Sequence, residues 1–261
     1  MTYSPAGSAE YGMQVSRGLI AGQSQVLVRG HQPNQATGAV FIDIWENIIN
    51  RVLLTSAEQM RITSTLAADD GAPLGTGAQT VLVMGVDNTG AAIQDLITMN
   101  GVANVLTPSS FLRVNSMVVT AAGSGGSNAG VITAIADVAL TQQSHMNADE
   151  GISQDGWYTV PLGKTLFVNQ VEFNLAKNAG GAQPVVDFRA IAAQGGRLSG
   201  AAFIQLFDKK LDAAVSNEYD LKIWMNPASA AIARTDIIMQ ATTDQNATEM
   251  RIRLYGILID D

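Results

Sequence analysis

The chain has 261 residues, of which 47% are hydrophobic and only 15% are charged, and it carries a formal net charge of −8 and no cysteine. The hydrophobic content excludes a disordered chain, and the lack of cysteine excludes disulfides and thiolate metal sites. The lysines and arginines are dispersed, which argues against direct nucleic-acid binding because phosphate neutralisation needs clustered cations.

Residues 1–24 are rich in small and polar side chains, and we expect them to form an N-terminal arm that contacts a neighbouring subunit. Met1–Ala9 lacks the charged and apolar regions of a signal peptide, and no apolar run approaches the length of a bilayer span. We therefore expect a soluble product that is made without a signal peptide and has no membrane partner.

The first half of the chain alternates short apolar runs with Gly, Asn, Asp or Pro, which is typical of a sandwich or barrel. Asp87-Asn88-Thr89-Gly90 separates two such runs and predicts a tight hairpin, and Asn100-Gly101 repeats the device. The expected strands are Gln25–Arg29, Ala39–Trp45, Val52–Leu54, Met60–Leu66, Thr80–Val86, Ala92–Met99, Phe111–Thr120 and Gly130–Ile135.

Polarity rises over residues 142–156, and we interpret this segment as a linker between two domains. A second series of strands follows it, and the last of these turns wholly apolar, which predicts a central strand that ties the C-terminus into the fold. These strands are Trp157–Pro161, Thr165–Leu175, Val185–Ala192, Ala202–Phe207, Tyr219–Met225, Thr235–Ala241 and Glu249–Ile259.

The predicted fold is therefore all-β, with two β-sandwich (jelly-roll-like) domains joined by Gly-rich turns. The expected organisation is an arm over 1–24, a sandwich over 25–141, a linker over 142–156 and a second sandwich over 157–261.

The Gly/Ser segment Gly123–Gly130 does not fit a phosphate-binding loop. It lacks the required glycine spacing and a Gly-Lys-Ser/Thr sequence, and it leads into a β-type segment rather than a helix. We interpret it as a surface loop, and no cofactor is predicted.

The histidines, His31 and His145, do not specify a metal site by spacing. His145 and Asp149 share a face only if that segment is helical, and two ligands do not complete a tetrahedral site, so a solvated linker is the preferred interpretation. Without cysteine or a Gly-Xaa-Ser-Xaa-Gly elbow, nucleophilic catalysis has no basis in the sequence.

The adjacent acidic pairs are poor candidates for a catalytic cleft, because neighbouring residues on a strand point to opposite faces. Asp69-Asp70-Gly71 fits a turn better than a calcium loop. The other two pairs are Asp149-Glu150 and Asp260-Asp261. The predicted catalytic, cofactor-binding and metal-binding sets are therefore all empty.

Three tryptophans, Trp45, Trp157 and Trp224, fall in separate predicted strands. They fit buried sandwich anchors better than a carbohydrate-binding platform. Asn246-Ala247-Thr248 matches the glycosylation pattern, but without a secretory signal the match is attributed to chance.

The segment from Asp69 to Asp87, with Ile97–Gly101 and Phe111–Val114, resembles structural proteins of tailed bacteriophages, many of them marine. Tyr158–Thr165 and Arg234–Ile237 continue the resemblance, whereas Glu46–Arg51 replaces the Gly-rich turn that follows the first tryptophan in that family. The resemblance implies a virion component without catalytic residues.

The hypothesis that follows is a non-enzymatic virion structural protein, assembled in the host cytoplasm, that decorates or cements the capsid. Its expected partners are further copies of itself and major capsid or tail proteins. A tail adaptor or fibre-base protein and a carbohydrate- or receptor-binding virion module are the alternatives. A glycan depolymerase needs two carboxylates facing each other across a cleft, which the sequence does not indicate.

Overall fold

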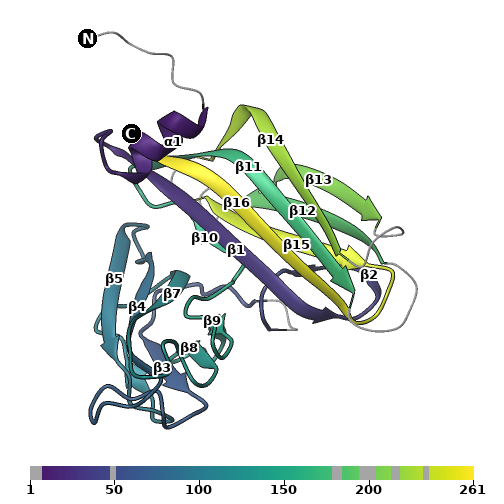
Figure 1. Ribbon diagram of the computed structural model, residues 1–261. Coiled ribbons are helices and arrows are strands. Elements are labelled where there is room, and N and C mark those ends of the chain that lie inside the picture. Colours follow the sequence, from purple (N-terminus) through teal and green to yellow (C-terminus); the bar gives the residue numbers. More distant parts are fainter. Residues whose placement is uncertain (1–7, 48–50, 178–183, 194–203, 213–217, 232–234) are drawn as a thin grey trace.

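The computed structural model describes residues 8–47, 51–177, 184–193, 204–212, 218–231 and 235–261. Figure 1 shows two β-sandwiches, one built from both ends of the chain and the other from its middle. The all-β prediction is confirmed, and α1 (Ser8–Ser16) is the one helix among the described residues. This helix is too short to cross a membrane.

The first sandwich has two antiparallel sheets. One sheet has the strand order β1-β16-β11-β14, and the other has the order β10-β15-β12-β13 with β2 also paired to β15. The strands are β1 (Gln23–Gln35), β2 (Gly38–Asp43), β10 (Trp157–Thr159), β11 (Lys164–Lys177), β12 (Val185–Ala193), β13 (Ile204–Asp212), β14 (Glu218–Ala231), β15 (Asp236–Thr243) and β16 (Thr248–Asp260).

The pairing in this sandwich is nested. β1 pairs with β16, β2 and β10 pair with β15, β11 pairs with β14, and β12 pairs with β13, all antiparallel. The first strand of the sandwich therefore pairs with the last, the second pairs with the one before the last, and the inner strands continue this pattern. This is the strand order of a jelly roll. We refer to this sandwich as the jelly roll.

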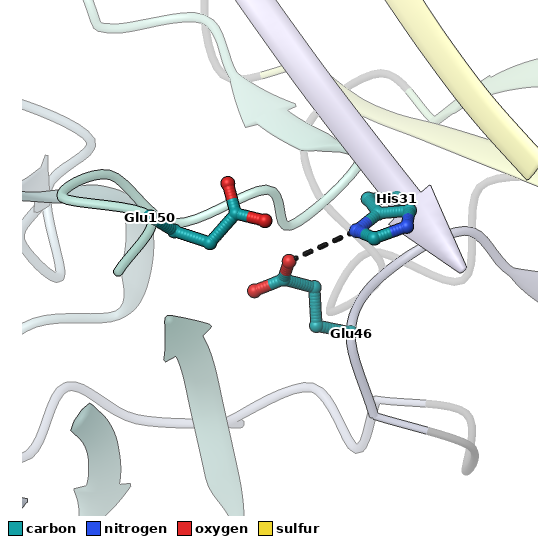
Figure 2. Close-up of side chains that lie close together, drawn as sticks. All are labelled: His31, Glu46 and Glu150. Carbon is teal, nitrogen blue, oxygen red and sulfur yellow. Dashed lines mark hydrogen bonds and ion pairs between the residues drawn. The ribbon is translucent and has the colours of Figure 1, made fainter. Parts of the chain in front are cut away.

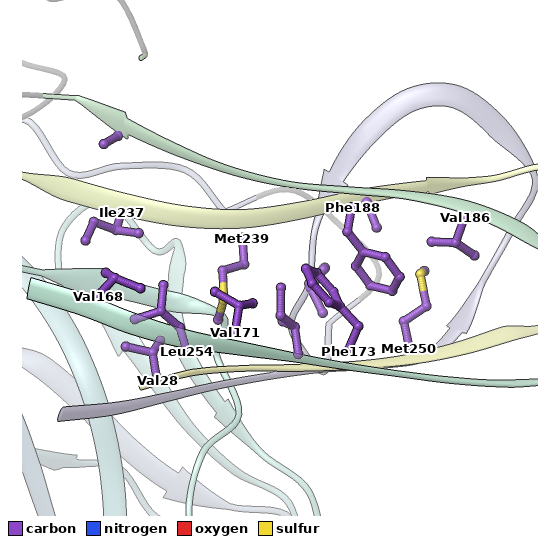
Figure 3. Close-up of a cluster of buried hydrophobic side chains, with 14 of the residues drawn as sticks. Val28, Val168, Val171, Phe173, Val186, Phe188, Ile237, Met239, Met250 and Leu254 are labelled. Atoms are coloured by element: carbon purple, nitrogen blue, oxygen red, sulfur yellow. The ribbon is translucent and has the colours of Figure 1, made fainter. Parts of the chain in front are cut away.

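The core of the jelly roll forms between its two sheets because successive side chains of each strand point alternately towards the core and away from it. In β16, Met250, Ile252 and Leu254 are buried while Arg251 and Arg253 point outward. β16 lies between β1 and β11, so the prediction of a central C-terminal strand is confirmed. Figure 3 shows side chains from both sheets interleaving, and the rings of Phe173 and Phe188 lie 4.8 Å apart across the core.

The second sandwich is inserted between β2 and β10, and we call it the inserted sandwich. Its sheets have the orders β6-β3-β8-β9 and β5-β4-β7, and side chains from both sheets share one hydrophobic core. Its strands are β3 (Met60–Ser64), β4 (Ala78–Val86), β5 (Ala92–Thr98), β6 (Val105–Leu106), β7 (Arg113–Ala122), β8 (Ile132–Ala136) and β9 (Gln142–Met146).

The predicted hairpin between β4 and β5 is present. Val86 pairs with Ala92, Gly90 has a φ of 88°, and the Asp87 carboxylate accepts hydrogen bonds from the backbone amides of Thr89 and Ala91. The hydrogen bond from the Thr89 hydroxyl is the main reason why the pKa of Asp87 is lowered.

Strand pairing divides the chain differently from the predicted boundaries. Residues 25–43 were assigned to the first sandwich over 25–141, but β1 pairs with β16 and β2 pairs with β15. The predicted linker over 142–156 contains β9, which pairs with β8, and the predicted arm over 1–24 contains α1. The predicted strand Val52–Leu54 is not a strand.

A deletion tests this division. A variant in which a short Gly/Ser linker replaces residues 52–154 keeps every strand of the jelly roll, and it keeps Arg51 and Asp155, which form an ion pair. We expect cooperative thermal unfolding by circular dichroism. The fragment 157–261 lacks β1 and β2 and should show no cooperative transition; if the fragment unfolds like the deletion variant, the division is wrong.

Candidate functional site

The chain passes between the two sandwiches twice, once after β2 and once before β10, and the sandwiches meet there. β1 lies against the segment that leads into β10. Gly156 donates a backbone hydrogen bond of 2.7 Å to Arg29, and His31 donates one of 3.3 Å to Gln154. A Cβ atom on Gly30 would lie 2.7 Å from the carbonyl oxygen of Ile44, and one on Gly156 would lie 2.0 Å from the same oxygen. Glycine therefore permits three backbone segments to approach closely.

Arg51 lies at the centre of this junction and is buried. Its guanidinium lies 4.8 Å from the ring centroid of Trp45 and 5.3 Å from that of Trp157. It also forms an ion pair of 3.1 Å with Asp155, while its backbone amide donates a 3.0 Å hydrogen bond to Asp43. The two indole faces and the carboxylate compensate for the loss of hydration at the buried cation.

Burial affects both members of this ion pair. It lowers the pKa of the Arg51 guanidinium, and the nearby carboxylates of Asp155 and Asp43 oppose that shift. It raises the pKa of Asp155, and Arg51 opposes that shift. Removing either partner would leave the other charge buried without its ion-pair partner, which typically costs about 3–5 kcal/mol.

A second arginine joins the inserted sandwich directly to the jelly roll. Arg113 of β7 donates a 3.2 Å hydrogen bond to Asp236 of β15 and a 2.9 Å hydrogen bond to the carbonyl oxygen of Leu54. Its guanidinium also lies 5.8 Å from the ring centroid of Trp157. Trp157 therefore contacts both buried arginines.

A histidine and three carboxylates lie beside the arginines, and Figure 2 shows three of these four side chains converging. Nδ1 of His31 lies 3.1 Å from Glu46, and its Nε2 lies 3.1 Å from Glu249. His31, Glu46 and Glu150 each offer a ligand atom, and these atoms all lie within 4.8 Å of one another. We call these four residues, Glu249 included, the histidine–carboxylate cluster.

The cluster draws on four separate parts of the chain, and Glu249 comes from β16. His31 lies in β1, Glu46 follows β2, and Glu150 lies in the loop after β9. The backbone amide of Asn147 donates a 2.9 Å hydrogen bond to Glu46, which links that carboxylate to the inserted sandwich. In the sequence Glu150 stands out only as the acidic neighbour of Asp149, and no spacing connects it to His31 or Glu46.

His145 and Asp149, the pair closest to a metal motif in the sequence, do not lie on a helix. His145 lies in β9, where Gln142 and Asn147 contact its two ring nitrogens at 2.7 and 3.1 Å. Asp149 lies in the following turn with a φ of 64°.

Asp69 and Asp70 have separate structural roles. Asp70 accepts a 2.8 Å hydrogen bond from the amide of Ala72, two residues on, as the turn prediction requires. Asp69 is buried, and it accepts hydrogen bonds from the amides of Ala78, Ala129 and Gly130 and from the hydroxyl of Ser64. Asp69 therefore joins three loops of the inserted sandwich.

The Gly/Ser segment Gly123–Gly130 is a loop with an exposed tip at residues 124–126. Its base is fixed by Asn128, which is buried and donates 2.7 Å hydrogen bonds to the carbonyl oxygens of Gly130 and Asn147. The surface-loop prediction is confirmed for this tip.

The two remaining polar motifs lie near the ends of strands. Asp260 pairs with Lys164, and Asp261 accepts a 2.5 Å hydrogen bond from Thr165. Asn246 lies in the turn between β15 and β16, where its side chain accepts a 2.8 Å hydrogen bond from the amide of Thr37.

Trp45 and Trp157 are buried, as predicted, with exposed fractions of 1% and 2%. Neither offers an open face on which a sugar could stack. The side chain of Trp224 lies outside the described residues.

No family model matches the chain, and the comparison with curated proteins gave no match. The solved structures similar to it include T=1 particles derived from infectious bursal virus, at 12% identity and a TM-score of 0.19, covering 91% of this chain and 70% of that chain. They also include the VP2 subviral particle of infectious bursal disease virus, at 10% identity and a TM-score of 0.19, covering 91% and 72%. At this score the similarity supports no inference, so the architecture rests on strand pairing.

The close approach at Gly156 can be tested with a matched pair of variants. Gly156 and Gly163 have φ values of 60° and 76°, but a Cβ atom on Gly163 meets nothing within 4 Å. Gly163→Ala should cost about 1–2 kcal/mol of unfolding free energy, from the left-handed backbone alone. Gly156→Ala should cost clearly more in urea unfolding, and equal losses would contradict the junction geometry.

Proposed function

We propose that this protein is a non-enzymatic structural component of a tailed-phage virion, which assembles on the capsid as a decoration or cement protein. The observation that carries the proposal is the jelly-roll strand order, interrupted in its second strand by a whole second sandwich. Viral capsid domains use this fold, and so do lectins and cupins, so side chains must support the choice among them.

The side chains at the junction favour an architectural role. Trp45 and Trp157 contact buried arginines, so neither forms a sugar platform. Asp155 and Asp236 form ion pairs with these arginines, and Asp69 joins separate loops within the inserted sandwich. These carboxylates hold the fold together, which is consistent with a protein that acts by shape and contact.

The inserted sandwich carries an exposed apolar surface suited to assembly. Leu66, Leu74 and Val102 have exposed fractions of 48%, 75% and 63%. They lie on two loops that are joined by a hydrogen bond from the amide of Gly101 to the carbonyl oxygen of Asp69. Exposed apolar groups gathered on neighbouring loops are typical of protein–protein contact sites. We infer that this loop surface contacts other copies or other virion proteins.

Light scattering after size-exclusion chromatography tests the proposal. We expect the full chain to form a closed oligomer, a trimer or a larger ring, and Leu74→Asp to reduce the mass towards the monomer by placing a charge in the contact. Leu162→Asp makes the same change at a 54% exposed position of the jelly roll and should leave the mass unaltered.

Negative-stain electron microscopy of the same fractions shows whether ordered assemblies form. A chain that is monomeric at every concentration, without rings or ordered assemblies in the micrographs, would contradict an assembly role.

A further inference from the structure

We propose that His31, Glu46 and Glu150 bind one divalent transition-metal ion of the zinc class, which ties the jelly roll to the inserted sandwich. One imidazole nitrogen and two carboxylate oxygens from three chain segments lie within 4.8 Å of one another, as Figure 2 shows. This inference is independent of the proposed virion role, because it rests on the junction alone.

The charges at the cluster call for a cation. The Glu46 side chain is fully buried, and its partners are His31, the amide of Asn147 and the side chain of Gln154. Within the described part of the chain, no lysine or arginine forms an ion pair with Glu46 or Glu150. Buried carboxylates are normally paired with cations or coordinate metals.

Glu249 supports His31 from the other side of its ring. Glu249 lies 3.1 Å from Nε2 of His31, and the charge of Glu249 is balanced by Arg251, with which it forms an ion pair of 3.0 Å. An N–H at Nε2 that donates to Glu249 leaves the lone pair of Nδ1 facing the Glu46 carboxylate at 3.1 Å. A lone pair facing an anion is repulsive unless a metal ion or a proton lies between them. A carboxylate behind a histidine is also the usual support for a histidine that binds zinc.

The ligand set indicates the class of ion. Two ligands bonded at about 2.0 Å to a tetrahedral ion lie roughly 3.3 Å apart, close to the 3.1 Å between Nδ1 of His31 and Glu46. Calcium and magnesium prefer all-oxygen sites, whereas nitrogen with carboxylate oxygen suits zinc. Glu150 is half-buried and Glu249 is 25% exposed, so an ion can enter from this side.

Calorimetric titration of the full chain with zinc chloride, after dialysis against EDTA and then metal-free buffer, tests the site. We expect one equivalent to bind, with proton release, and the thermal midpoint to rise. Glu150→Gln should weaken binding by more than about tenfold, and Glu249→Gln by about 10–100-fold. Asp149→Asn is the control, because it removes the same charge one residue away, and asparagine tolerates the φ of 64° found there.

Several results would overturn the proposal. The first is the absence of stoichiometric zinc binding by the wild-type chain. The second is a zinc affinity of Glu150→Gln equal to that of the wild type, and the third is a loss of affinity in Asp149→Asn equal to that in Glu150→Gln. The thermal midpoints of the variants in EDTA, compared with that of the wild type, show that each variant is folded. A proton shared between His31 and Glu46, with no zinc bound, would explain the cluster without a metal and would count against the proposal.

Discussion

The buried guanidinium of Arg51, held between Trp45 and Trp157 and paired with Asp155, is the interaction on which the arrangement of the two sandwiches depends. It contacts both segments that connect the sandwiches, the one after β2 and the one that leads into β10. A buried cation is tolerated only where aromatic ring faces and negative charges replace its lost hydration on several sides. The guanidinium therefore fixes the positions of the groups around it. Glu46 lies between Trp45 and Arg51 in sequence, and the position of the histidine–carboxylate cluster follows from the same constraint.

The jelly roll accepts a whole inserted sandwich because the insertion interrupts an edge strand. β2 and β10 both pair with β15 alone and lie at the edge of their sheet, so separating them leaves the central pairings of β15 and β12 intact. An insertion within β16 or β11 would break ladders on both sides. The inserted sandwich has its own hydrophobic core, and the buried contact of Arg113 with Asp236 joins it to the jelly roll.

Local patterns predicted most strands but not their partners. Asp87–Gly90 predicted a hairpin because turn chemistry is local, whereas the pattern of Gln25–Arg29 contains nothing that specifies pairing with the last strand. The domain boundaries were therefore misplaced. His31, Glu46 and Glu150 come together only because the nested pairing and the two crossings bring them there. No single-segment motif could reveal that site, and the polar segment 142–156 was the one signal near it.

Differential scanning calorimetry tests most directly whether the arginine junction unites the two sandwiches. We expect one transition for the wild-type chain and two for Arg51→Met, because Asp155 then lacks its partner and each core unfolds separately. Arg61→Met is the matched control, since the ion pair of Arg61 with Asp137 is partly exposed and lies within one sandwich, and it should keep one transition. Two transitions in the wild type, unchanged in Arg51→Met, would show that the arginine junction does not unite the two sandwiches.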